Sequence, residues 1–127
     1  MISRHLGAGV VAGALTLSSS IALAQGDPAQ GEKVYNKCKA CHVVEEPQNR
    51  VGPHLVGLFG RQAGSVEDFR YSDAMKESGI TWNEETIAEY VADPRGYIKG
   101  NRMAFVGLKK EEEIADLIAY LKEATAN

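Results

Sequence analysis

A chain of 127 residues is long enough for one domain, and its net charge of −3, from 14 basic and 17 acidic residues, argues against nucleic-acid binding. It has only two cysteines, whereas a structural zinc site needs four ligands. A domain of this size buries only roughly 65% of its unfolded surface, so a bound apolar group would add to its core.

The first 24 residues have the layout of a secretory signal peptide. Arg4 precedes a small and apolar run at residues 6–17, and Ala22-Leu23-Ala24 forms an Ala-x-Ala cleavage site. A membrane anchor is the alternative, but the run is short for a span of about 20 residues and polar residues interrupt it. We therefore expect cleavage after Ala24, no stable membrane insertion, and a single exported domain of residues 25–127 with a net charge of −4.

The first helix is expected to begin at Asp27-Pro28, because aspartate caps helices and proline suits their first position. Gln30 is placed to complete a capping box. Gly31 inside this helix costs about 1 kcal/mol relative to alanine, which favours close approach of another helix over mere tolerance. One face of the helix repeats at helical spacing, with Gly31, Val34, Tyr35 and Cys38.

That face ends at Cys38-Lys39-Ala40-Cys41-His42, a pattern typical of c-type haem attachment. Each thiol can add to one vinyl group, and His42 then lies beneath the ring, where its imidazole can bind iron. A bare Cys-x-x-Cys also fits a thioredoxin-like redox site or half of a zinc site, but the surrounding pattern is mainly helical. We predict one covalent haem c, with both thiols consumed and no disulfide.

Residues 43–60 are predicted to form mostly loop. Glycines alternate with apolar residues towards its end, as expected where backbone lies against a flat ligand. The Pro53 carbonyl is expected to accept the free N–H of His42, which would set the tautomer of the ring. His54 is the alternative iron ligand, although we interpret it as a partly exposed loop histidine.

Four further segments complete an all-α prediction of about four to five helices. A short helix is expected at 72–78, ended by Gly79, and Thr81-Trp82-Asn83-Glu84 has the form of a capping box that starts a helix to Ala92. A single-turn helix is expected at 94–97, and residues 98–108 form an ordered loop. The last helix has the clearest periodicity, through Ile114, Leu117, Ile118 and Leu121.

A second iron ligand is expected from a methionine. Met75 lies in a predicted helix, where a core role is the default, whereas Met103 lies in the 98–108 loop, which can bring a thioether over the far face of the ring. The alternative for Met103 is an apolar plug. Ligation by His42 and Met103 would fill both axial positions and would favour electron transfer over catalysis.

Several motifs in the right order resemble class I cytochrome c, over residues 26–122. They are residues 38–42, 52–61, 79–82, 97–103 and 116–122. The resemblance implies a cytochrome c fold, with helices wrapped around one covalently attached haem and with His42 and Met103 as axial ligands. It also implies that Gly31 and Tyr35 cross the last helix near Leu117 and Tyr120.

The resemblance assigns further residues to the haem. Arg61, Tyr71 and Trp82 match residues that hydrogen-bond or neutralise the propionates, Tyr90 matches a tyrosine near the methionine sulfur, and Phe105 matches an aromatic at the exposed haem edge. The chain departs from the family at three positions. Lys99 replaces a proline, Met75 stands where many relatives have asparagine, and Asn101 replaces a threonine that contacts a propionate, a contact that its amide is still expected to make.

These features predict a monomeric carrier of single electrons, not an enzyme. Its donor would be a cytochrome bc-type complex or a dehydrogenase, and its acceptor a terminal oxidase or a photosynthetic reaction centre. A haem peroxidase or gas-binding protein is the alternative if Met103 leaves the iron, and a thiol-disulfide redox protein if no haem is present. Partners are expected to dock on basic residues that border the haem edge, away from Glu84, Glu85 and residues 111–113. The basic residues are Lys37, Arg50, Arg95, Lys99, Arg102, Lys109 and Lys110.

Overall fold

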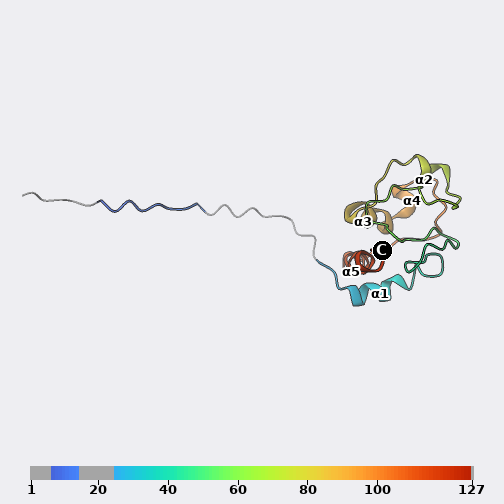
Figure 1. Ribbon diagram of the computed structural model, residues 1–127, viewed down its shortest axis with the longest axis horizontal. Helices are drawn as coiled ribbons and strands as arrows, with labels where there is room; N and C mark the ends of the chain where they lie inside the picture. Colours follow the sequence, from blue (N-terminus) through green and yellow to red (C-terminus); the bar gives the residue numbers. More distant parts are fainter. Residues whose placement is uncertain (1–6, 15–24, 127) are drawn as a thin grey trace, which may run out of the picture.

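The computed structural model describes residues 7–14 and 25–126, so the predicted cleavage site after Ala24 lies outside the described residues. Within those ranges it contains helices and no strand, which confirms the all-α prediction (Figure 1). None of the described helices is both long enough and apolar enough to cross a membrane. The helices are α1 (Pro28–Tyr35), α2 (Asp73–Glu77), α3 (Glu84–Ala92), α4 (Pro94–Tyr97) and α5 (Glu111–Ala124).

Helices α1 and α5 lie side by side at one end of the helical body, and α2, α3 and α4 lie at the other (Figure 1). Gly31 allows the crossing, because a Cβ there would collide with the Asp116 carbonyl oxygen and the Tyr120 side chain. The rings of Tyr35 and Tyr120 pack 5.3 Å apart at the same crossing. The predicted close approach at Gly31 is therefore confirmed.

The start of α1 is tied to α5, and the predicted capping box with Gln30 is wrong. The Asp27 carboxylate accepts the Ala29 N–H at 2.9 Å, as expected of an N-cap. However, the Asp27 N–H donates to the carboxylate of Asp116 at 2.8 Å, so α5 supplies the acceptor that Gln30 was expected to provide.

Helix α3 begins two residues later than predicted. Asn83 is its N-cap and forms the capping box with Thr86, so the predicted start at Thr81 is wrong. The reason is tertiary: the Trp82 N–H donates to the Arg61 carbonyl at 2.8 Å, and the Gly60 N–H donates to the Trp82 carbonyl at 2.7 Å. These bonds hold the segment before Asn83 in an extended conformation.

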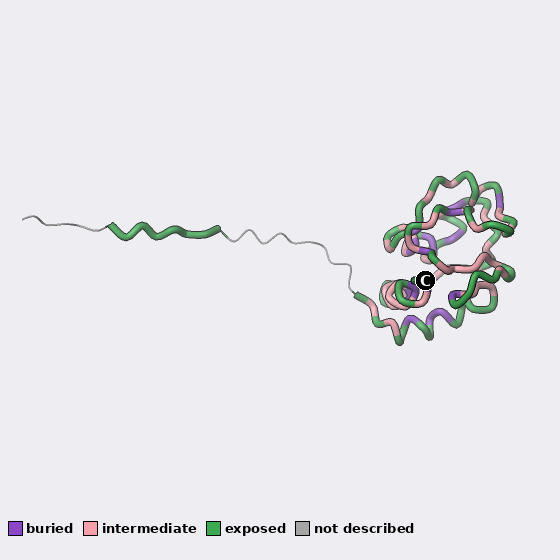
Figure 2. Tube along the Cα trace, viewed as in Figure 1, coloured by how far each residue is buried: buried purple, intermediate pink, exposed green. Residues whose placement is uncertain are grey.

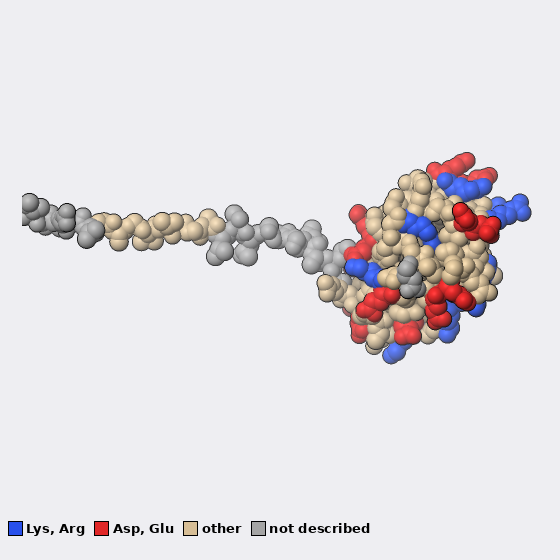
Figure 3. Space-filling model, in the orientation of Figure 1, with Lys and Arg blue, Asp and Glu red and all other residues tan. Residues whose placement is uncertain are grey.

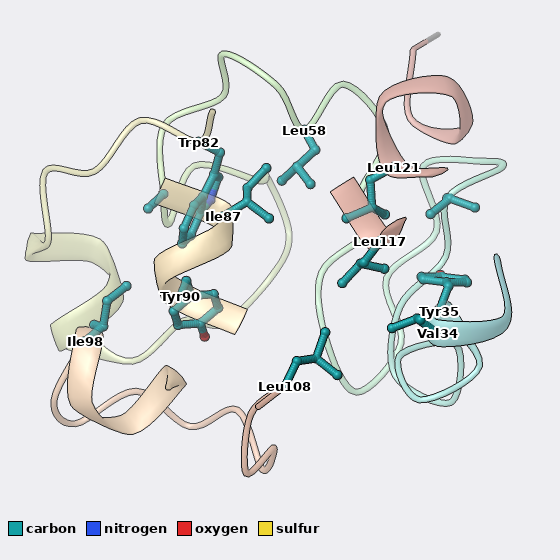
Figure 4. Packing of buried hydrophobic residues seen from close by; sticks show 12 residues of the cluster. Val34, Tyr35, Leu58, Trp82, Ile87, Tyr90, Ile98, Leu108, Leu117 and Leu121 are labelled. Carbon is teal, nitrogen blue, oxygen red and sulfur yellow. The ribbon is translucent and has the colours of Figure 1, made fainter. Parts of the chain in front are cut away.

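The buried side chains come from both ends of the body. Figure 4 shows Trp82 with Ile87 and Tyr90 of α3 on one side, and Val34 of α1 with Leu117 of α5 on the other. Burial follows the helix faces inside the body, whereas residues 7–14 are exposed (Figure 2). Cys38, Met103 and Phe105 are among the partly buried residues that pack against this core. The residues predicted to contact one prosthetic group therefore adjoin one hydrophobic core.

Candidate functional site

The Cys-x-x-Cys-His segment follows α1 as a series of hydrogen-bonded turns. The Cys38 N–H donates to the Tyr35 carbonyl at 2.7 Å, and the Cys41 and His42 N–H groups donate to the Cys38 carbonyl at 3.1 and 3.0 Å. This geometry keeps the two thiols on one turn of backbone. Both cysteines are half-buried and are not joined to each other.

The environment of Cys38 does not suit thiol-disulfide chemistry. Burial raises the pKa of its thiol to about 11, with a further contribution from Cys41. A redox-active cysteine needs a lowered pKa, because the thiolate is the reactive species. The described residues also contain no group of three or more histidine, cysteine or carboxylate side chains that could hold a metal ion, so neither a redox site nor a zinc site is supported there.

His42 is oriented by a hydrogen bond, and its surroundings favour the neutral imidazole. Its Nδ1 lies 2.8 Å from the Pro53 carbonyl oxygen, which confirms the predicted hydrogen bond and leaves Nε2 with its lone pair. Burial lowers the pKa of His42, and the charge of Arg61 lowers it further, although the bond to Pro53 opposes the shift. Gly52 lies against the imidazole so closely that a Cβ would collide with the ring.

Met103 is held by its backbone and by a neighbouring hydroxyl. Its N–H donates to Asn101 Oδ1 at 2.8 Å, and the Tyr90 hydroxyl lies 3.7 Å from its sulfur atom. The thioether therefore lies beside Tyr90, as the resemblance implies. A neutral sulfur and a neutral imidazole are a ligand pair that suits haem iron.

Asn101 does not have the donor that its predicted propionate contact needs. Its amide group donates both N–H bonds to backbone carbonyls, to Pro94 at 2.7 Å and to Ile98 at 2.8 Å. An asparagine amide has two N–H groups, so none remains for a carboxylate. In this structure the carbonyls of Pro94 and Ile98 therefore compete with the propionate contact that was expected of Asn101.

The guanidinium of Arg61 has one buried N–H group without a hydrogen-bond acceptor. Its Nη1 donates to the carbonyls of His54 at 2.9 Å and Val56 at 3.2 Å. Its Nε is buried without a partner, and no other side-chain nitrogen or oxygen of the described residues has this condition. A buried unsatisfied N–H is costly, and an anionic oxygen at this position would remove the cost. The site therefore fits a group that carries a carboxylate.

Tyr71 and Trp82 have the chemistry expected beside that carboxylate. The Tyr71 hydroxyl accepts the Val66 N–H at 3.2 Å, so its own proton remains available for donation. Trp82 is buried, and its ring packs 5.1 Å from that of Tyr90. Arg61 and Tyr71 can therefore offer donors to a carboxylate, and the two thiols can offer attachment to vinyl groups, which fits a haem.

The two alternative iron ligands lie in other settings. His54 is a half-buried loop residue whose Nδ1 accepts the Val56 N–H at 3.2 Å. Met75 lies in α2, where its N–H donates to the Ser72 hydroxyl at 3.1 Å and its side chain packs against the core. Among the described residues, the Met75 sulfur has no neighbouring hydroxyl like that of Tyr90 beside Met103. The His54 ring likewise has no carbonyl partner like that of Pro53 beside His42.

The predicted basic residues are less separated from acidic ones than expected. Lys37 lies 3.8 Å from Glu113, so one of the predicted basic residues has an acidic neighbour. Lys109 donates to the Ala92 carbonyl at 3.0 Å, so its ammonium group supports the loop. Figure 3 shows basic and acidic side chains interspersed on the face in view.

Comparisons with known proteins agree with this site. The family model described as Cytochrome c matches residues 28–125. The chain is 48% identical to cytochrome c2 of Blastochloris viridis over 120 residues, 93% of this chain and 94% of the relative. It is 54% identical to cytochrome c of Chlamydomonas reinhardtii over 103 residues, 80% of this chain and 92% of the relative. The solved structure of cytochrome cH from Methylobacterium extorquens aligns with a TM-score of 0.73 and 42% identity, covering 77% of this chain and 99% of that one.

Proposed function

The chain belongs to the cytochrome c family, and from that premise we propose that it is a periplasmic carrier of single electrons whose haem iron is bound by His42 and Met103. As a member of this family it carries covalently attached haem c and transfers electrons; it is not an enzyme. Cys38 and Cys41 fit the attachment motif. Residues 1–24 are the proposed leader, and cleavage after Ala24 leaves residues 25–127 as the mature domain.

The haem, when bound, supplies an iron that alternates between the ferric and ferrous states. The protein's own residues then have three tasks. Pro53 orients His42 and keeps its Nε2 unprotonated, Tyr90 lies beside the Met103 thioether, and Arg61 offers its buried Nε to a propionate. If His42 and Met103 both bind the iron, the protein would leave no ligand position for oxygen or peroxide.

One observation carries this proposal: His42 and Met103 are each oriented by hydrogen bonds to different residues. The His42 imidazole is oriented by Pro53 at 2.8 Å, and Met103 is held by Asn101 at 2.8 Å and adjoins the Tyr90 hydroxyl. Ligands that are already oriented need little rearrangement when the iron changes oxidation state. Such a site favours fast electron transfer over substrate turnover.

The proposed partners are membrane redox complexes that dock near the exposed haem edge. The donor is a cytochrome bc-type complex or a dehydrogenase, and the acceptor is a terminal oxidase or a photosynthetic reaction centre. Arg50, Lys99 and Arg102 support this docking, since they are exposed and have no ion-pair partner within the residues described. We propose that the carrier acts as a monomer.

The test is expression in a host that matures c-type cytochromes, followed by mass spectrometry of the denatured protein and near-infrared spectroscopy. We expect the mass of the mature peptide plus one haem, and a ferric near-infrared band from methionine ligation. Met103→Ala should abolish the band and allow carbon monoxide to bind the reduced protein, whereas the matched control Met75→Ala should keep the band. A colourless protein at its peptide mass contradicts haem attachment, and loss of the band only in Met75→Ala contradicts the ligand assignment.

A further inference from the structure

Asn101 is the most completely hydrogen-bonded side chain in the Met103 loop. Its amide N–H groups donate to the carbonyls of Pro94 and Ile98, and its Oδ1 accepts the Met103 N–H at 2.8 Å. The Tyr90 hydroxyl lies 3.4 Å from the same oxygen. An asparagine amide can donate twice and accept twice, so its whole capacity is used.

These bonds join three parts of the chain to one side chain. Pro94 begins α4 and Ile98 follows its end, Tyr90 belongs to α3, and Met103 lies in the loop. Gly100, at φ +91°, turns the backbone so that Asn101 can reach all of them. The bond from Met103 N–H to Asn101 Oδ1 spans two residues, which is the local turn that asparagine favours.

From this arrangement we propose that Asn101 is the positioning residue for the Met103 thioether. This inference rests on the proposed function, because it concerns the proposed sulfur ligand. Asn101 holds the Met103 backbone directly, and its Oδ1 shares the single Tyr90 hydroxyl proton with the Met103 sulfur, which lies 3.7 Å from that hydroxyl. It therefore determines both the place of the sulfur and how strongly Tyr90 donates to it.

Threonine could not perform the same task. Its hydroxyl can accept the Met103 N–H, but it has one proton and cannot donate to the carbonyls of Pro94 and Ile98 together. Asparagine at position 101 thus bonds to the carbonyls of Pro94 and Ile98 and fixes the loop with the same side-chain amide. The loop is held in this way although Lys99 occupies the position where a proline would restrict its backbone.

The experiment measures how easily imidazole displaces the Met103 sulfur from ferric iron in the mature holoprotein. Imidazole binding and the near-infrared methionine band are titrated in the wild type, Asn101→Leu, Asn101→Thr and Asn49→Leu. Asn49 is the matched control, since it is also a loop asparagine that accepts a backbone N–H, from His54, and donates to a backbone carbonyl, that of Glu67. Global stability is recorded by urea unfolding for every variant.

We expect the apparent affinity for imidazole to rise about tenfold in Asn101→Leu and about threefold in Asn101→Thr, because a looser sulfur competes less well. The affinity in Asn49→Leu should stay within about twofold of the wild type. Equal affinities in the wild type and both Asn101 variants, with the methionine band intact, overturn the inference alone. An equal rise in Asn49→Leu also overturns it, because the effect is then general loosening. A wild type without the methionine band overturns the proposed Met103 ligation and this inference together.

Discussion

The hydrogen bonds of Arg61 indicate what kind of group its site binds. Two of its contacts are to the carbonyls of His54 and Val56, which accounts for one end of the guanidinium. Its Nε is buried with nothing to donate to, a condition that native proteins rarely tolerate. The donor is explained if a carboxylate of the prosthetic group lies beside it.

Replacing Arg61 should change the reduction potential. In Arg61→Leu a partly buried positive charge is lost, which favours the ferric state, so we expect the potential to fall by about 50 mV. The exposed Arg70 is the control, and Arg70→Leu should change the potential by less than about 10 mV because solvent screens its charge. Potentiometric titration measures both values. An equal shift in the two variants would show that Arg61 has no special proximity to the iron.

Tyr90 links burial to alkaline stability. Burial raises its pKa from 10.0 to about 12, so the unfolded chain loses this proton at a lower pH than the folded protein. The stabilisation is therefore complete below pH 10 and is lost between pH 10 and 12. Relative to Tyr90→Phe, the wild type should lose about 1.4 kcal/mol of unfolding free energy between pH 9 and pH 11. Urea unfolding at the two pH values measures this difference, and parallel losses in both proteins would contradict it.

Single residues determine how helices α1 and α5 pack against each other. Gly31 lets α1 approach α5, and Asp116 of α5 accepts the N–H of Asp27 at the start of α1. Packing and capping thus act at the same crossing. Helix α3 shows the opposite case, because backbone pairing with residues 60–63 decides where it begins.

Gly31→Ala should destabilise the protein although alanine favours helices. In an open helix this change would stabilise by about 1 kcal/mol, but here the Cβ meets the Asp116 carbonyl, and we expect a loss of about 2 kcal/mol. Gln30→Ala, on the exposed face of α1, should stay within about 0.5 kcal/mol of the wild type. Urea unfolding compares the three proteins. A stabilised Gly31→Ala protein would refute the close crossing.

The start of α3 can be tested by two alanine substitutions. Asn83→Ala removes the side-chain acceptor for the Thr86 N–H and should cost about 1 kcal/mol of unfolding free energy. Thr81→Ala should cost less than about 0.5 kcal/mol, because the contact of Thr81 with Thr86 is made by its carbonyl. Chemical denaturation distinguishes the two sites. A larger cost at Thr81 would restore the earlier start that the capping pattern predicted.

The charges of the whole molecule combine an acidic balance with local basic residues. Glu113 lies beside Lys37, so an acidic side chain adjoins one of the residues proposed to dock partners. Lys122 pairs with Glu84, which links α5 to α3. In the proposed docking, a few basic residues and not the net charge would attract an acidic partner.

Electron transfer to an acidic membrane complex should therefore respond to individual charges. At low ionic strength Arg102→Gln should lower the bimolecular rate about threefold, and Glu113→Gln should raise it, since each changes the field near the proposed docking surface. Glu85→Gln, on α3, is the control and should have a smaller effect. All differences should vanish near 1 M salt, where the Debye length is about 3 Å. Equal rates in the four proteins at low salt would contradict electrostatic steering.

Local patterns in the sequence were sufficient to predict the fold class, the family and the haem-attachment motif. The Cys-x-x-Cys-His spacing, the periodicity of α5 and the proline and glycine positions each depend on neighbouring residues, and they predicted the all-α class and the family. The bond from His42 to Pro53 also followed, because both residues belong to recognisable local segments. Such features are decided within one turn or one loop.

Tertiary structure alone decided the features in which distant segments compete for the same groups. The capping pattern at Thr81 was overridden by backbone pairing with residues 60–63, and the N–H of Asp27 was taken by Asp116 instead of Gln30. Asn101 was expected to reach a propionate, but the carbonyls of Pro94 and Ile98 take both of its donors. A polar group bonds to the acceptor that folding brings nearest, and a linear pattern does not contain that distance.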